Sequence, residues 1–139
     1  MNIQTIVSVS CQEVAAHSVL LEDNEQIDIE NSFYKMVEEG VDEKACMLAS
    51  LEGDIANGGF EQLFLNKDCE FINSALNLLK AIGATEKHRL TEEAVQVHQK
   101  YSETLARYNE FQKKILRIED AFHCSEENIP VLYHKKYNA

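Results

Sequence analysis

The chain has 139 residues, of which 45% are hydrophobic, and this length and composition fit one folded domain spanning residues 1–139. Thirteen Lys and Arg residues oppose 24 Asp and Glu residues, and the resulting formal net charge of −11 disfavours direct nucleic-acid binding, because carboxylates repel phosphates. No apolar run approaches the roughly 20 residues that span a bilayer, and residues 1–10 lack the pattern of a signal peptide, so we expect a cytoplasmic protein without membrane contact.

The net charge is concentrated in the first half of the chain. Residues 1–66 hold 13 acids against 2 bases, which gives −11, whereas residues 67–139 hold 11 of each and are neutral. Complementary potentials steer association, so this asymmetry favours a basic protein partner, although solubility alone also explains an acidic domain. The acids that we expect to face such a partner are Glu22, Asp23, Glu25, Asp28, Glu30, Glu38, Glu39, Asp42 and Glu43.

The chain before residue 28 gives a mixed pattern. Apolar residues at 6, 7 and 9 alternate loosely with serines, which is typical of a short strand, and residues 11–21 keep helical spacing. Residues 21–26 are acidic and are predicted to form a connector. A helix is then predicted from Asp28 to Glu39, with four apolar side chains on one face: Ile29, Phe33, Met36 and Val37.

Glycine and aspartate mark the boundaries of the next helices. Gly40 is predicted to end the preceding helix in the left-handed conformation, and Asp42 is predicted to cap the next one. That helix is predicted to reach residues 57–59, where two adjacent glycines allow a sharp corner, and to resume over residues 60–66. A further helix is predicted over residues 70–82.

A heptad pattern dominates the C-terminal half of the chain. From Thr85 onward, mostly apolar or aromatic residues alternate four and three apart without an intervening Gly or Pro. These seam positions are Leu90, Ala94, Val97, Tyr101, Thr104, Tyr108, Phe111, Ile115, Ile118 and Phe122. One helix over residues 86–122 would be about 55 Å long. We therefore expect either a break near Asn109, which with Gln112 suits a capping box, or packing of the free end on a second subunit.

The last predicted helix begins at Ser125-Glu126-Glu127 and contains Tyr133 and Tyr137. Taken in chain order, these elements predict an all-α fold. We expect a compact single domain of about six helices, including one long helix or a helix pair in the C-terminal half.

The sequence carries no signature of catalysis. The segment Asn57-Gly58-Gly59-Phe60 lacks the lysine and the spacing of a phosphate-binding loop, and the five histidines and four cysteines are scattered without metal-ligand spacing. A Cys–His nucleophile pair stays open as an alternative, because such partners meet in space and not in sequence. We predict a protein that is not an enzyme, has no catalytic residues and needs no metal or cofactor.

The segment from Leu51 to Asn66, LEGDIANGGFEQLFLN, is the least common local pattern in the chain. Its residue types fit a helix–helix corner. The two glycines allow positive φ, the asparagines can satisfy backbone groups at helix ends, and Phe60 and Phe64 lie one turn apart where they can anchor the corner in the core. The pattern therefore predicts a structural role for this segment.

Together with Ala81-Ile82-Gly83-Ala84, this corner resembles the signature of a bacterial family of DNA-mimic proteins. The matching positions are Glu52, Asn57, Gly58, Gly59, Phe60, Gln62, Phe64, Asn66, Ile82, Gly83 and Ala84. The resemblance covers roughly residues 28–137 and implies an all-α fold. For the best-known member it also implies an acidic dimer that occupies the DNA-binding surface of a transcription factor.

Three functions are compatible with these patterns. In the first, rows of carboxylates stand in for DNA phosphates and block the basic nucleic-acid-binding surface of a partner protein. In the second, the same acidic surface makes the chain an immunity protein or antitoxin that neutralises a toxin, such as a nuclease. In the third, the heptad seam over residues 90–122 makes the chain a structural or oligomerisation module and a homodimer.

Overall fold

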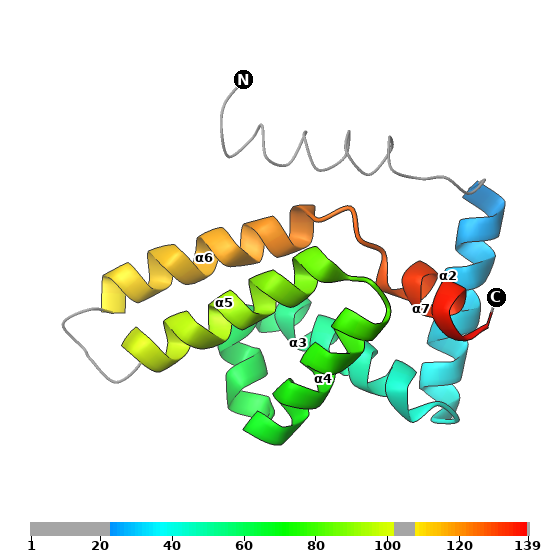
Figure 1. Cartoon of the computed structure of the whole chain (residues 1–139), viewed down its shortest axis with the longest axis horizontal. Helices are drawn as coiled ribbons and strands as arrows, with labels where there is room; N and C mark the ends of the chain where they lie inside the picture. The colour runs from blue at the N-terminus through cyan, green and yellow to red at the C-terminus, as the bar shows by residue number, and fades with distance from the viewer. Residues whose placement is uncertain (1–22, 102–107, 139) are drawn as a thin grey trace.

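The computed structural model describes residues 23–101 and 108–138, and these residues form six α-helices (Figure 1). The helices are α2 (Asp23–Glu39), α3 (Glu43–Asn66), α4 (Cys69–Ala81), α5 (Thr85–Tyr101), α6 (Tyr108–Cys124) and α7 (Ile129–Tyr137). No strand occurs among the described residues, so the predicted all-α architecture of about six helices is confirmed. The strand expected near residues 6–9, the helix expected over residues 11–21, and Glu22 lie outside the described residues.

The helix α2 begins five residues earlier than predicted. It starts at Asp23, so the prediction of an acidic connector over residues 21–26 is wrong from Asp23 onward. Asp23 and Glu25 lie in the first helical turn, where the positive end of the helix dipole stabilises carboxylates. Acidity at this point therefore favours a helix over a linker. The end of α2 at Glu39 is as predicted.

The turn between α2 and α3 has the predicted geometry. Gly40 has a φ of 66°, and its N–H donates to the carbonyl of Val37 over 3.1 Å. The carboxylate of Asp42 accepts a hydrogen bond of 3.1 Å from the backbone N–H of Ala45, which caps α3. Both sides of the turn are thus fixed by hydrogen bonds within the chain.

The helix α3 bends at its two adjacent glycines, as predicted (Figure 1). Gly58 has a φ of −145°, whereas Gly59 has a φ of 75° and a ψ of −171°. This second combination is essentially restricted to glycine. The helix therefore consists of two arms joined at a corner, and Gly59 is the residue that requires the conformational freedom of glycine.

The chain between α4 and α5 makes a tight reversal. Asp68 caps the start of α4 by accepting a hydrogen bond of 2.8 Å from the backbone N–H of Phe71. Past the end of α4, Gly83 has a φ of 85°, and the N–H of Ala84 donates to the carbonyl of Leu79 over 2.8 Å. Ile82 and Ala84 are buried on either side of this glycine. The Ile-Gly-Ala segment is therefore a helix stop whose apolar residues enter the core.

The heptad seam folds back on itself as two helices, α5 and α6, which lie side by side (Figure 1). The helix α5 ends at Tyr101 and α6 begins at Tyr108, so the expected break near Asn109 is confirmed, although Asn109 is already helical and does not cap α6. The seam positions buried on the two helices are Leu90, Ala94, Phe111, Ile115, Ile118 and Phe122. Both α5 and α6 bury their seam residues in the same core, so the heptad pattern does not change where one helix ends and the other begins.

The last helix begins later than predicted. It starts at Ile129, with Asn128 as its cap, and the residues 125–127 that were expected to open it are not helical. The carboxylate of Glu127 instead accepts hydrogen bonds from the backbone N–H groups of Glu86 at 2.9 Å and Lys87 at 2.7 Å. This acid therefore caps α5 rather than its own helix.

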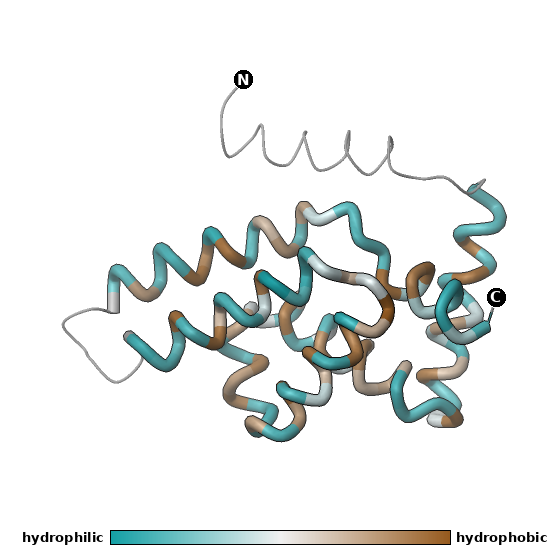
Figure 2. The backbone as a smooth tube through the Cα atoms, in the orientation of Figure 1, coloured by the Kyte–Doolittle hydropathy of each residue, from teal (hydrophilic) through white to brown (hydrophobic). Residues whose placement is uncertain are grey.

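One hydrophobic core joins all six helices. It takes buried side chains from every element, including Phe33, Leu51, Phe60, Leu79, Leu90, Ile118 and Tyr133. Hydrophobic and hydrophilic positions alternate along α5 and α6 in Figure 2, as expected for helices with one buried face. Among the described residues, no helix is both long and apolar enough to cross a membrane.

Candidate functional site

The predicted partner-facing acids lie on α2 and on the turn that leads into α3. We call them the acidic surface, which in the described residues comprises Asp23, Glu25, Asp28, Glu30, Glu38, Glu39, Asp42 and Glu43. Six of the eight are exposed, and only Glu30 and Asp42 are partly buried. Residues 23–43 contain a single base, Lys35. The chain thus gathers these acids on one continuous segment with little internal neutralisation.

The acids of α2 occupy two sides of the helix. Residues three or four apart in a helix share a face. Asp23, Glu30 and Glu38 therefore lie along one side, and Glu25, Asp28 and Glu39 lie along the other. The buried Phe33 faces the core between these two sides. A partner approaching α2 from either flank meets carboxylates.

Two of these acids also hold the fold together. The carboxylate of Asp42 accepts a hydrogen bond of 2.6 Å from the hydroxyl of Tyr133. Glu30 accepts one of 3.2 Å from the side-chain amide of Asn128. Burial opposes the charge on Asp42, but the hydrogen bonds from Tyr133 and from the backbone outweigh it, so the pKa of Asp42 is lowered. Asp42 and Glu30 thus tie α7 to the acidic segment, and Asp42 is less available to a partner.

Replacing Tyr133 with Phe should lower the free energy of unfolding by about 1–2 kcal/mol at pH 7, because it removes a hydrogen bond to a charged group. A lowered folded-state pKa stabilises the protein above the unfolded value, near 3.8 for Asp42, and this stabilisation is lost as pH falls through the folded value. The difference in free energy of unfolding between wild type and Tyr133→Phe should therefore be smaller at pH 3 than at pH 7. Urea unfolding at pH 7 and pH 3, with Tyr137→Phe as the control, measures it. A gap independent of pH would contradict this assignment.

The corner formed by the family-signature residues is anchored in the core by Phe60. Phe60 is fully buried, with its ring 6.2 Å from that of Phe64 and 5.6 Å from that of Phe122. The backbone N–H of Phe60 donates to Glu119 Oε2 over 2.8 Å. The carboxylate of Glu119 lies against Gly59, where a Cβ atom would overlap it. Burial raises the pKa of Glu119, against the lowering effect of the Phe60 hydrogen bond.

The remaining signature residues surround this corner. The side-chain amide of Asn66 donates to Asp54 Oδ1 over 3.1 Å, and Lys67 pairs with Asp54 Oδ2 at 3.1 Å. The side chain of Gln62 packs over Gly58, where a Cβ atom would overlap it. Asn57 is exposed at the end of the first arm of α3. These contacts lie within and beside the corner of α3.

A buried ion pair links the signature residue Glu52 to α5. The ammonium of Lys87 lies 3.3 Å from Glu52 Oε2 and 4.8 Å from the centre of the Phe122 ring. Lys87 is only 8% exposed. Sequence reasoning missed both Lys87 and Glu119, because their partners lie 35 and 59 residues away. In each case, the sequence signal that could have found the residue is a single charged side chain at a position that faces the heptad seam.

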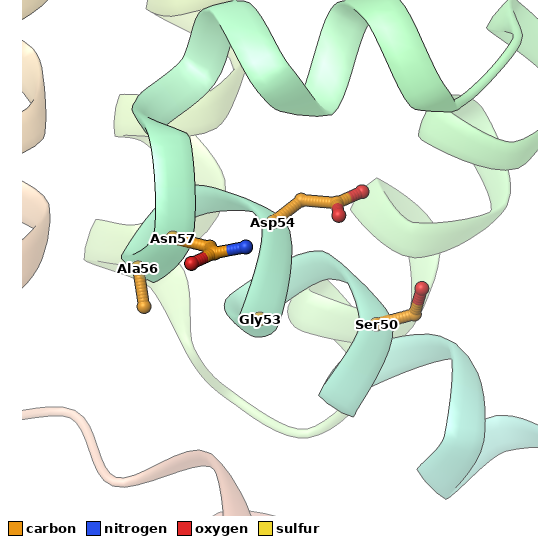
Figure 3. Close-up of a pocket in the computed structure, with 5 residues that line it drawn as sticks. All are labelled: Ser50, Gly53, Asp54, Ala56 and Asn57. Carbon is orange, nitrogen blue, oxygen red and sulfur yellow. The ribbon is translucent and has the colours of Figure 1, made fainter.

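One concave feature of the described surface lies along α3. A shallow depression of about 470 Å³ is lined by Ser50, Gly53, Asp54, Ala56 and Asn57, which all lie on the first arm of α3 (Figure 3). Its one carboxylate, Asp54, is already engaged by Asn66 and Lys67. Within the described residues, no group of three or more His, Cys, Asp or Glu side chains is placed to hold a metal ion.

Comparison with known proteins places the chain in a family. A family model of DMP19-like proteins matches residues 22–137, which extends the resemblance seen in the sequence by six residues toward the N-terminus. Neither a curated protein nor a solved structure matches the chain. The match covers most of the sequence and includes the acidic surface and the Gly58-Gly59 corner. The chain therefore belongs to the DMP19-like family of DNA-mimic proteins.

Proposed function

We propose that this protein binds the basic, nucleic-acid-binding surface of a partner protein through its acidic surface, and thereby blocks that surface. The observation that carries the proposal is the row of exposed carboxylates on α2 and the following turn, in a chain that belongs to a DNA-mimic family. The DMP19-like family is not a known enzyme family, and we propose a binding role without catalysis.

The dimensions of α2 fit this role. Its 17 residues extend over about 25 Å at 1.5 Å per residue. Phosphates recur about every 3.4 Å along one DNA strand, so the same length of duplex presents about seven of them on each strand. Carboxylates on both sides of α2 give the helix an acidic density of the same order. A surface that binds phosphates through Lys and Arg would therefore meet complementary charge here.

Two alternatives differ in how they use the chain. An immunity protein or antitoxin would use the same acidic surface as a DNA mimic. The identity of the partner distinguishes these functions, because an immunity protein binds a toxin such as a nuclease and a DNA mimic of this kind binds a regulator. Oligomerisation through the heptad seam is not supported. The seam positions Leu90, Ala94, Phe111, Ile115, Ile118 and Phe122 are already buried within the chain.

Charge reversal at the acidic surface tests the proposal. We expect Glu38→Lys with Glu39→Lys to weaken binding to a basic DNA-binding partner at least tenfold, because it places like charges opposite one another. The partner would be captured from the native lysate by the wild-type chain, purified and titrated by isothermal calorimetry. The matched control is Glu92→Lys with Glu93→Lys, an adjacent and exposed pair on α5. This control should change the affinity by no more than about twofold.

The salt dependence gives a second readout of the same experiment. Contacts between exposed charges weaken as ionic strength rises, so wild-type affinity should fall between 50 and 300 mM salt. Binding that ignores salt, or that survives the reversal at Glu38 and Glu39, would refute the proposal.

A further inference from the structure

One side of α2 alternates acidic and apolar side chains. Asp23, Ile27, Glu30, Tyr34 and Glu38 follow one another at spacings of four, three, four and four residues. Such spacings keep side chains on one face of a helix. We call this face the mixed stripe. A surface that only imitated phosphate charge would have no use for the two apolar members.

Both apolar members of the mixed stripe are open to solvent. Ile27 is 51% exposed and Tyr34 is 48% exposed. Exposed apolar side chains that occur singly are ordinary, but a contiguous patch bordered by polar groups is typical of an interaction site. Val41, which is 71% exposed, follows the end of the same helix. The largest exposed apolar residues of α2 thus lie among the acids of its surface.

Tyr34 is packed against Phe33 and is about half exposed. Its ring lies edge-on to the buried ring of Phe33, with the centres 5.2 Å apart. No described residue forms a hydrogen bond with its hydroxyl. Burial, followed by the charges of Glu52 and Glu30, raises the pKa of Tyr34, which places its phenol among carboxylates. The phenol of Tyr34 therefore lies near these two carboxylates.

Other aromatic rings of this chain already hold a cation. Lys44 lies 4.6 Å from the ring centre of Tyr137, Lys67 lies 5.3 Å from that of Phe71, and Lys87 lies 4.8 Å from that of Phe122. In the described part of the chain, no cation is placed over Tyr34. An exposed ring between acids is a favourable position for a cation supplied by another molecule.

We propose that Tyr34 receives an arginine of the partner, with the guanidinium stacked on its ring and paired with a neighbouring carboxylate of the mixed stripe, while Ile27 contacts an apolar side chain beside that arginine. This inference rests on the proposed function and names the partner's contact surface. Arginine suits the position better than lysine, because its planar guanidinium stacks on a ring and bonds a carboxylate at once. A second copy of the chain fits poorly, because it would bring one acidic stripe against another.

The test compares two peptides against the full-length protein. Both are 14-residue amphipathic helices with the same leucines and the same net charge, one carrying arginine and the other lysine at every basic position. Binding is measured by fluorescence anisotropy. We expect the wild-type chain to prefer the arginine peptide roughly two- to fivefold. Tyr34→Ala should remove this preference and weaken binding of the lysine peptide less than binding of the arginine peptide.

Two further variants keep the test falsifiable. Tyr34→Phe retains the ring and should retain the preference, which separates stacking from any loss of fold in Tyr34→Ala. Leu65→Ala removes a more exposed apolar residue, 85% exposed, outside the mixed stripe and should behave as wild type. Circular dichroism confirms that each variant is helical before its binding is measured.

The outcomes separate the two proposals. Equal affinity for both peptides in the wild-type chain, or a preference that survives Tyr34→Ala, overturns the inference. If the inference is overturned in this way but charge reversal at Glu38 and Glu39 still weakens peptide binding, the proposed function stands without the role of Tyr34. If neither peptide binds, the inference is overturned, and the titration of the native partner against the variant reversed at Glu38 and Glu39 decides the proposed function separately. A wild-type dimer in sedimentation that Tyr34→Ala dissociates would assign the face to a second copy and overturn the inference.

Discussion

Replacing Gly59 with Ala is expected to lower the free energy of unfolding by about 3 kcal/mol, with a fall in Tm of about 10 °C. Gly59 has a φ of 75° and a ψ of −171°, a backbone conformation that costs a residue with a Cβ atom about 1–3 kcal/mol. The new methyl group would also overlap the carboxylate of Glu119. Displacing that carboxylate leaves the N–H of the buried Phe60 without its acceptor, at a further cost of about 1–3 kcal/mol.

Gly53 supplies the matched control for this substitution. It lies in the helical first arm of α3, and a Cβ atom there would meet nothing within 4 Å. Gly53→Ala should therefore leave stability unchanged or raise it by up to about 1 kcal/mol, because alanine favours the helix. Urea unfolding of the two variants measures the difference. Equal stability of Gly59→Ala and Gly53→Ala would mean that the corner does not require the conformational freedom of glycine.

The second large effect concerns the ion pair between Glu52 and Lys87. We expect Glu52→Gln to lower the free energy of unfolding by about 2 kcal/mol, because it leaves the buried ammonium of Lys87 without a counter-charge. This value is below that of a fully buried pair, since the side chain of Glu52 is 24% exposed and that of Lys87 is 9% exposed. Adding Lys87→Met removes the stranded charge and should recover part of the loss, with a coupling energy of about 1 kcal/mol.

An exposed pair on α5 is the control for this cycle. Arg89 and Glu93 lie 3.4 Å apart, with side chains 62% and 49% exposed. Surface pairs of this kind contribute little, so Glu93→Gln should change stability by less than about 0.5 kcal/mol. Chemical denaturation of Glu52→Gln, Lys87→Met, the double variant and Glu93→Gln gives the comparison. If the effects at positions 52 and 87 are additive, or if Glu52→Gln and Glu93→Gln have equal effects, the Glu52–Lys87 pair contributes no more to the free energy of unfolding than the exposed pair does.

Local sequence chemistry predicts much of this fold. Gly40, Asp42 and Gly83 act where the sequence placed them, because each satisfies a backbone requirement that depends only on its neighbours. The corner at Gly58-Gly59 was predictable for the same reason. The buried face of α2 around Phe33 follows from its helical period. Each of these features depends on residues a few positions apart.

The errors have both distant and local causes. The start of α7 shifts to Ile129 because Glu127 caps a helix about 40 residues earlier. Asn109 was wrongly predicted to cap the second seam helix, because α5 and α6 bury the same face and the heptad pattern does not change where α6 begins. The acidic residues before Asp28 were read as a connector, although charge near a helix start stabilises it.

The candidate surface was predictable in composition and not in arrangement. The sequence indicates that the acids between residues 22 and 43 are the most concentrated in the chain. It does not show that Asp42 and Glu30 also bond α7, because Tyr133 and Asn128 lie 91 and 98 residues away. The mixed stripe could have been found from the spacing of Ile27 and Tyr34, but its significance depends on their exposure.

Competition with DNA is the most direct test of the central claim, that the acidic surface occupies a nucleic-acid-binding surface. A purified partner is first bound to fluorescently labelled duplex DNA, and the wild-type chain is then added while anisotropy is recorded. We predict that the chain releases the DNA, that added unlabelled duplex reverses the release, and that the variant reversed at Glu38 and Glu39 fails to release it. A stable ternary complex of partner, DNA and this protein would contradict the account.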